Sequence, residues 1–191
     1  MSQVTCDQLF GTPIWHIESE LPEGVIDWAL SIEKNVENQN GKRSGRLGYQ
    51  SPRLSTMHTA RGALQHPMTN WDEFPYFDHV KKELDFLPQF KFNNYWVNVN
   101  RKNAYNVKHT HPCVDLSVVW YLTDSMGLMV IEHPMVHTRT HLYEKIGYGI
   151  NFSMNIPAGH LIVFPSDLPH YVEPHDLDDP RITVALNLNV I

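Results

Sequence analysis

The spacing of apolar side chains changes about halfway along the chain. In residues 22–38, apolar positions recur every three to four residues, which predicts an amphipathic helix. Residues 76–87 show the same spacing and are followed by Pro88, which predicts a second helix that ends there. Residues 38–50, between the two, are polar and rich in glycine, and they predict a flexible loop.

Outside these helices the pattern is typical of β-strands. Residues 10–17 alternate aromatic and β-branched side chains, which predicts a strand, and Pro13 predicts that it lies at a sheet edge. The continuous apolar run at 116–122 indicates a strand buried on both faces. The further strands that we expect are residues 95–99, 128–131, 161–164, 170–172 and 182–188.

Two helices followed by many short strands predict a mainly β fold of the α+β kind. We expect a double-stranded β-helix, or jelly roll, with flanking N-terminal helices packed on one sheet. A chain of 191 residues fits one domain. Residues 1–90 should supply an N-terminal strand and the supporting helices, and residues 91–191 the jelly-roll core.

Composition and charge narrow the possible functions. The net charge is −6, and lysine and arginine are scattered, which disfavours nucleic acid or an anionic membrane as the main partner. Two cysteines are too few for a disulfide framework or a thiolate zinc site. The sequence shows no membrane-spanning apolar run and no secretion signal, so we expect a cytoplasmic protein.

Most of the 12 histidines lie in the second half of the chain, and three have metal-ligand spacing. His109 and His111 are two residues apart, so an extended strand would present both on one face. His170 belongs to a later predicted strand. Two neighbouring ligands and a distant third predict a facial site with open positions, the arrangement typical of non-haem Fe(II) oxygenases.

The usual facial site includes a carboxylate, which leaves two candidate ligand sets. Asp115, four residues after His111, could replace that histidine as the second ligand. We favour His111, because its spacing from His109 needs no turn. The remaining histidines of this region are expected on loops or the outer face, namely His133, His137, His141, His160 and His175.

Arg181 and Thr183 predict an anion clamp. They are two residues apart on a predicted strand, so both side chains face the same side. A guanidinium beside a hydroxyl is suited to holding a carboxylate, and the distal carboxylate of 2-oxoglutarate would be such a partner. The alternative is an exposed ion pair between Arg181 and Asp178 or Asp179.

A series of short motifs accompanies these residues in a fixed order. The motifs occupy residues 96–100, 109–112, 116–122, 157–159, 164–166, 170–174 and 181–183, leading to Asn187, with weaker matches at 9–15 and 48–51. Through them the chain resembles the phage and bacterial 2-oxoglutarate/Fe(II) oxygenases of the prolyl-4-hydroxylase-like superfamily. The match is dense over about half of the chain.

The resemblance implies an enzyme, a non-haem Fe(II) and 2-oxoglutarate-dependent dioxygenase in the cytosol of a bacterium or a phage-infected host. Its cofactors would be Fe(II), 2-oxoglutarate and O₂, and it would hydroxylate an unidentified substrate with release of succinate and CO₂. By position, the metal ligands would be His109, His111 and His170, and the co-substrate clamp would be Arg181 with Thr183. Asn98 and Tyr121 are candidates for hydrogen bonds to the chelating end of 2-oxoglutarate.

The chain departs from the family pattern in two places. Val118 stands where the family usually has glycine, and it is expected to narrow the pocket. Residues 132–148 form a long, histidine-rich insert in place of a short hairpin, and they are expected to form a substrate lid.

Two other classes of jelly-roll protein remain as alternatives. A cupin-type enzyme that does not use 2-oxoglutarate would explain the spacing of His111 and Asp115, but it would have no need for Arg181. A non-catalytic binding protein would bind no 2-oxoglutarate at all.

Overall fold

The structure is a computed structural model that describes residues 4–9, 11–55, 74–133, 145 and 151–191. The helices are α1 (Val25–Asn35) and α2 (Phe77–Glu83). The strands are β1 (Val4–Leu9), β2 (Thr12–Ile17), β3 (Gly45–Arg46), β4 (Tyr49–Gln50), β5 (Leu54–Ser55), β6 (Phe90–Asn100), β7 (Tyr105–His109), β8 (Leu116–Tyr121), β9 (Met129–Glu132), β10 (Asn151–Met154), β11 (Leu161–Pro165), β12 (His170–Val172) and β13 (Arg181–Val190). The predicted mainly β class is confirmed.

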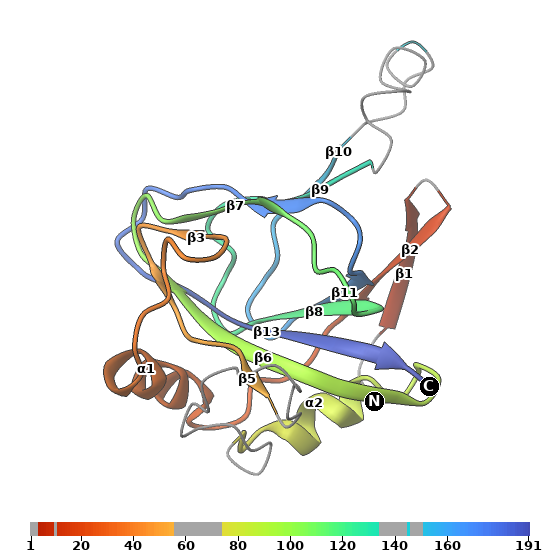
Figure 1. Cartoon of the computed structure of the whole chain (residues 1–191), viewed down its shortest axis with the longest axis horizontal. Helices are drawn as coiled ribbons and strands as arrows, with labels where there is room; N and C mark the ends of the chain where they lie inside the picture. The colour runs from red at the N-terminus through yellow and green to blue at the C-terminus, as the bar shows by residue number, and fades with distance from the viewer. Residues whose placement is uncertain (1–3, 10, 56–73, 134–144, 146–150) are drawn as a thin grey trace.

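The strands form two antiparallel sheets that lie over one another (Figure 1). The larger sheet has the order β1-β2-β11-β8-β13-β6-β4, and β5 also pairs with β6. The smaller sheet has the order β10-β9-β12-β7-β3. Neighbours in both sheets are mostly distant in sequence, so the residues between the sheets come from many parts of the chain.

The two helices cover the outer face of the larger sheet, as predicted (Figure 1). Both helices are shorter than the ranges that the apolar spacing predicted, which were residues 22–38 and 76–87. Gly24, just before α1, has a φ of 77°, a left-handed conformation that delays the start of this helix to Val25. Neither described helix is long and apolar enough to cross a membrane.

Strand β13 lies in the middle of the larger sheet, between β6 and β8. Its even-numbered aliphatic residues pack in the core between sheet and helices, namely Ile182, Val184, Leu186 and Leu188. Because side chains alternate along a strand, the odd-numbered residues face the smaller sheet, namely Arg181, Thr183, Ala185 and Asn187. A second core cluster, which includes Ile131 and Phe164, fills the space between the sheets at one end.

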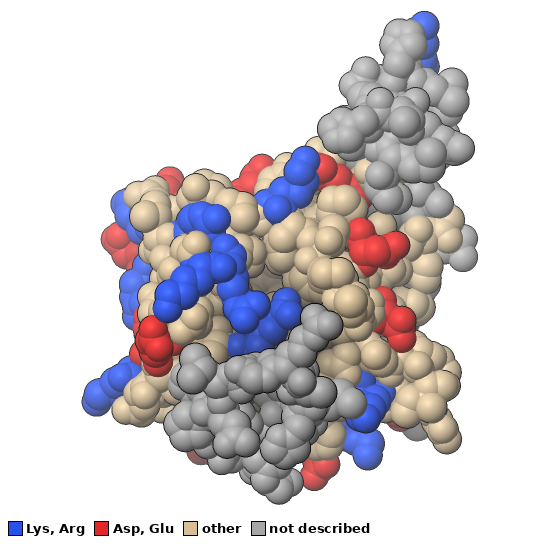
Figure 2. Space-filling view, in the orientation of Figure 1, with Lys and Arg blue, Asp and Glu red and all other residues tan. Residues whose placement is uncertain are grey.

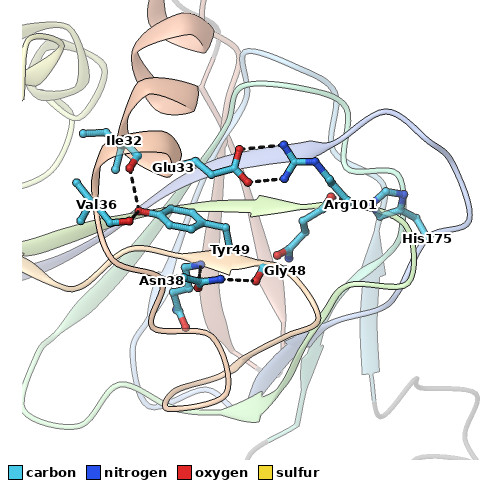
Figure 3. Close-up of polar contacts among 10 residues, drawn as sticks. Ile32, Glu33, Val36, Asn38, Gly48, Tyr49, Arg101 and His175 are labelled. Atoms are coloured by element: carbon cyan, nitrogen blue, oxygen red, sulfur yellow. Dashed lines mark hydrogen bonds and ion pairs between the residues drawn. The ribbon is translucent and has the colours of Figure 1, made fainter.

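Residues 38–50 are mostly turns and bends, as predicted for a loop, but they also contain the two-residue strands β3 and β4. The Tyr49 hydroxyl donates to the carbonyl oxygens of Ile32 (3.1 Å) and Val36 (3.3 Å), at the end of α1 (Figure 3). The Asn38 side chain bonds the backbone on both sides of Tyr49. These contacts join residues that are 10 or more positions apart, so the number of glycines in the segment does not predict them.

The predicted edge position of β2 is also wrong, since β2 lies between β1 and β11. Pro13 is tolerated there because β11 pairs only with Trp15, His16 and Ile17 of β2, beyond the proline. The missing N–H of Pro13 therefore removes no hydrogen bond to β11.

The alternation of β13 leads to a stability prediction. Leu186→Ala should lower the free energy of unfolding by about 2–5 kcal/mol, because Leu186 is fully buried and its removal leaves a cavity. Val190→Ala, on the same strand but 41% exposed, should change it by less than about 0.5 kcal/mol. Urea denaturation of both variants measures the difference, and equal losses would contradict the assignment of the buried face.

Candidate functional site

Three histidines meet between the two sheets. His109 ends β7, His111 follows it by two residues, and His170 begins β12, opposite His109 in the sheet register. Their candidate ligand atoms all lie within 4.8 Å of one another. Among the described residues this is the only group of histidine, cysteine or acidic side chains that could hold a metal.

Hydrogen bonds set the orientation of each imidazole. Nδ1 of His109 lies 2.7 Å from the carbonyl oxygen of Val107, and Nδ1 of His170 lies 2.8 Å from that of Leu168. Nδ1 of His111 lies 2.8 Å from Oδ1 of Asn187. Because all three acceptors are oxygens, each Nδ1 carries the proton, and each Nε2 keeps a lone pair for a metal.

Asn187 was not singled out as a functional residue, although a sequence signal for it exists. It follows Arg181 and Thr183 at a spacing of two, so it faces the same side of β13. Its own amide donates to Asn94 Oδ1 at 2.9 Å, which fixes Oδ1 toward His111. Counting by two along the strand would have placed it in the site.

The histidines are neutral in the metal-free protein. Burial lowers the pKa of His111 to about 4, although the hydrogen bond to Asn187 opposes the shift. Burial also lowers the pKa of His109, and it holds the pKa of His170 well below its ordinary value. Neutral imidazoles are the form that binds metals.

Asp115 lies apart from this cluster. Its carboxylate is exposed and accepts a hydrogen bond from the Val190 backbone N–H at 2.8 Å. Cys113 has a φ of 71°, a left-handed conformation, so the chain turns between His111 and Asp115. This turn separates the two side chains, and the placement favours His111 over Asp115 as the second ligand.

Arg181 is 2% exposed and its guanidinium is held by backbone carbonyls. Nη1 donates to Ser125 (3.2 Å) and Glu173 (3.0 Å), and Nη2 to Ala104 (3.4 Å). Gly127 allows this position, because a Cβ there would lie 3.0 Å from Nη1. These carbonyls fix the orientation of the guanidinium. Burial disfavours its charged form and therefore lowers the pKa of Arg181.

The alternative partners of Arg181 do not reach it. Asp178 and Asp179 are exposed, and Asp178 lies 3.8 Å from Lys102 instead. Within the described part of the chain, no carboxylate forms an ion pair with Arg181. A buried charge without a counter-charge is costly, so this arrangement favours an anionic ligand.

Three polar side chains form a row across the larger sheet beside Arg181. Thr183 lies opposite Tyr121 of β8 and opposite Asn98 of β6 in the register. Asn98 Nδ2 donates to Thr183 Oγ1 at 3.1 Å, while Asn98 Oδ1 is buried with no hydrogen-bond partner among the described residues. Tyr121 is buried, and burial raises its pKa, so it is a neutral hydroxyl.

A narrow cavity of about 40 Å³ joins these groups. It is lined by all the candidate residues except Asp115, namely His109, His111, His170, Arg181, Thr183, Asn98 and Tyr121. Val119 lines it, whereas Val118, which was predicted to narrow it, does not. Val118 belongs to the core beneath the helices, because adjacent residues of a strand face opposite sides.

The other histidines differ partly from expectation. His133 and His175 lie in loops, as expected, but both are buried, and His175 Nε2 lies 2.9 Å from the Asn100 carbonyl. His160 is half-buried in a loop. His137, His141 and nearly all of the insert at 132–148 lie outside the described residues, so the lid stays a prediction.

A wider cavity opens next to the histidines, and the sequence did not indicate it. It measures about 310 Å³ and is lined by Lys42, Arg43, Arg53 and Trp96 together with His109 and His111. These basic residues are not clustered with the histidines in the sequence, and only the pairing of β3 and β4 with distant strands places them together.

Comparisons with known proteins agree with this geometry. Residues 94–187 match the family described as "Putative 2OG-Fe(II) oxygenase", and this span contains the three clustered histidines and Arg181. A search among curated proteins found no match.

Solved structures share the fold at low sequence identity. HygX from Streptomyces hygroscopicus with nickel and 2-oxoglutarate bound has a TM-score of 0.61 and 11% identity, covering 94% of this chain and 83% of that chain. The non-heme alpha ketoglutarate dependent epimerase SnoN from nogalamycin biosynthesis has a TM-score of 0.64 and 13% identity, covering 93% and 77%. A Pseudomonas putida prolyl-4-hydroxylase has a TM-score of 0.54 and 14% identity, covering 97% and 96%.

The similar structures confirm the predicted jelly-roll fold. The match to a 2-oxoglutarate/Fe(II) oxygenase family confirms the predicted cofactors, Fe(II), 2-oxoglutarate and O₂. HygX has been solved with iron bound as well as with 2-oxoglutarate. The residues of the cavity fit such a group, because they offer three neutral imidazoles and a buried cation without a described counter-charge. The chain is therefore a 2-oxoglutarate-dependent Fe(II) oxygenase, whose residues 94–187 match this family.

Proposed function

We propose that this oxygenase hydroxylates an organic substrate and releases succinate and CO₂. The observation that carries the proposal is a single cavity that joins three neutral histidines to a buried arginine. The histidines are suited to hold the metal, and the arginine is suited to hold an anion. Both functions are needed at one place for 2-oxoglutarate to bind to iron while its far carboxylate is clamped.

His109, His111 and His170 would hold Fe(II) through Nε2. Three neutral ligands leave both positive charges of the ion to be offset by other groups. A dianionic co-substrate would offset part of this charge through the carboxylate at the metal, and its other carboxylate would pair with Arg181. The all-histidine ligand set and the buried arginine thus favour the same co-substrate.

Arg181 and Thr183 would bind the distal carboxylate, and Asn98 and Tyr121 would add hydrogen bonds. The Asn98 amide can turn so that Oδ1 accepts from the Thr183 hydroxyl and Nδ2 faces the cavity as a donor. This orientation would satisfy the Asn98 oxygen, which is otherwise buried without a described partner. Tyr121 would donate from its un-ionised hydroxyl.

The cofactors would supply the oxidising chemistry, in which one atom of O₂ enters a substrate C–H bond and the other enters succinate as 2-oxoglutarate loses CO₂. The contribution of the protein would be positioning and the exclusion of water. Val119, Met129 and Ala185 line the inner cavity with apolar surface, which limits the water near the histidines.

Both alternatives from the sequence are disfavoured. A cupin-type site would use Asp115, whose carboxylate instead bonds the Val190 backbone. The family match supports an enzyme over a non-catalytic binding protein.

The metal ligands can be tested by release of succinate. With Fe(II), ascorbate and O₂, the wild type should convert 2-oxoglutarate slowly to succinate even without its prime substrate. His170→Ala should abolish both metal binding and succinate release, because it removes one of three ligands. Elemental analysis and succinate quantification measure the two effects.

Asp115→Asn is the matched control for this experiment. It should retain the metal, because asparagine can still accept the Val190 hydrogen bond and the carboxylate is not a proposed ligand. Unchanged metal content in His170→Ala, or lost metal in Asp115→Asn, would overturn the ligand set.

The clamp can be tested by the affinity for 2-oxoglutarate. Arg181→Ala should weaken binding by a factor on the order of 30 or more, since unpairing a buried charge costs roughly 2–5 kcal/mol. Arg181→Lys should restore binding only in part, because an ammonium group lacks the bidentate fork. An anaerobic titration followed by the metal-to-ligand absorption band measures these affinities.

Arg101→Ala, which removes an arginine paired with Glu33 near the surface, should bind 2-oxoglutarate like the wild type. Equal affinities in all the variants would rule out Arg181 as the clamp. Loss of metal together with 2-oxoglutarate would mean that Arg181 is needed for the fold.

The buried histidines also predict a dependence of stability on pH in the metal-free protein. Their pKa values are lower in the folded chain than in the unfolded chain, so the unfolded chain binds more protons below pH 6.5. The free energy of unfolding should fall as the pH drops from 6.5 toward 4, by about 1 kcal/mol per pH unit for His111 alone. Urea denaturation at several pH values measures this dependence. The free energy of unfolding should change less with pH in His111→Gln than in the wild type, and an equal change in both would contradict the burial of a neutral His111.

A further inference from the structure

The wider cavity adjoins the proposed metal site directly. It measures about 310 Å³, and it shares Ser44, Trp96, His109 and His111 with the narrow inner cavity. This volume is within the range that holds small-molecule ligands. A molecule in the wider cavity would lie against two proposed metal ligands while the inner cavity holds the co-substrate.

Positive charge is concentrated at this cavity. Lys42, Arg43 and Arg53 line it, no described lining residue is acidic, and Figure 2 shows lysine and arginine side chains gathered around the hollow. Lys42 pairs with the exposed Glu37 at 3.2 Å. Arg43 and Arg53 form no ion pair with any carboxylate in the described ranges.

Arg53 is held close to the histidines by an aromatic ring. Its guanidinium carbon lies 5.4 Å from the centre of the Trp96 ring, a cation–π distance. The Trp96 ring centre in turn lies 5.3 Å from that of His111. The pKa of Arg53 is lowered by burial and by the nearby charge of Arg43, so the two cations oppose each other without a bound anion.

The wall that carries Arg43 is fixed by backbone hydrogen bonds. Gly41 N–H donates to the Gly45 carbonyl at 3.0 Å, closing the turn that contains Arg43. Val107 N–H donates to the Ser44 carbonyl at 2.9 Å, which joins this turn to the strand that leads to the histidines. The position of Arg43 beside the site is therefore part of the fold.

The rest of the molecule favours a small anion over a polyanion. The chain has a net charge of −6, which would repel an extended nucleic acid outside the cavity. The basic cavity is a local exception to that charge, and its volume suits one small molecule. Arg43 and Arg53 line the cavity together with His109 and His111, so their charges are next to the place where oxidation would occur.

We propose that this cavity is the substrate subsite of the oxygenase, and that it takes a small organic anion whose carboxylate or phosphate group binds Arg43 and Arg53. The inference rests on the proposed function, because it places the substrate next to the proposed metal ligands. With its carboxylate or phosphate group bound there, the substrate would present the carbon that is to be oxidised to the histidine cluster.

Inorganic phosphate can serve as the probe for the subsite. It is titrated by calorimetry into the full chain saturated with Ni(II) and 2-oxoglutarate. The proposed metal site and Arg181 are then already occupied and cannot bind the phosphate. The wild type should bind one phosphate per chain. Arg43→Gln and Arg53→Gln should each weaken binding about tenfold, as expected for the loss of one charge-assisted hydrogen bond.

Lys82→Gln, which removes an exposed charge on α2, is the matched control and should bind phosphate like the wild type. Absent phosphate binding, or equal binding in all four proteins, would overturn the subsite. Equal loss of 2-oxoglutarate affinity in Arg53→Gln would assign the cations to the co-substrate instead. Binding of a single-stranded oligonucleotide in place of phosphate would assign the surface to a polyanion. The affinity of the wild type for 2-oxoglutarate, measured separately, shows whether a failure concerns the subsite or the proposed function.

Discussion

The site depends on the alternation of side chains along β13. This strand is in the middle of the larger sheet, so both of its faces are covered. Its aliphatic residues pack against the helices, and its polar residues, from Arg181 to Asn187, must then face the smaller sheet. Because a shift of one residue would exchange the two faces, the packing that stabilises the protein also sets the register of the candidate site.

The balance of charge between the sheets follows from that register. Arg181 supplies a buried positive charge that backbone carbonyls hold but do not neutralise. The three histidines supply no charge of their own, since burial keeps them neutral. A metal ion and a dianion would together fill the cavity at low electrostatic cost, and each would favour the binding of the other.

The N-terminal region contributes to the site as well as to the core. Tyr49 joins β4 to the end of α1 (Figure 3). Ser44 joins the turn before β3 to β7. Those contacts hold Arg43 next to His109 and His111. Helix α1 therefore supports the wall of the outer cavity, in addition to covering the larger sheet.

Local spacing was enough to predict the mainly β class, the meeting of His109 with His111, and the pairing of Arg181 with Thr183 on one face. Alternation at a period of two is a property of the strand itself, so the sequence determines it directly. Tertiary structure decided what depends on pairing between distant segments: the position of Asp115 apart from the three histidines, the strands within residues 38–50, and the basic outer cavity. Such contacts join residues far apart in the chain, and no local pattern of apolar and polar positions encodes which strands become neighbours.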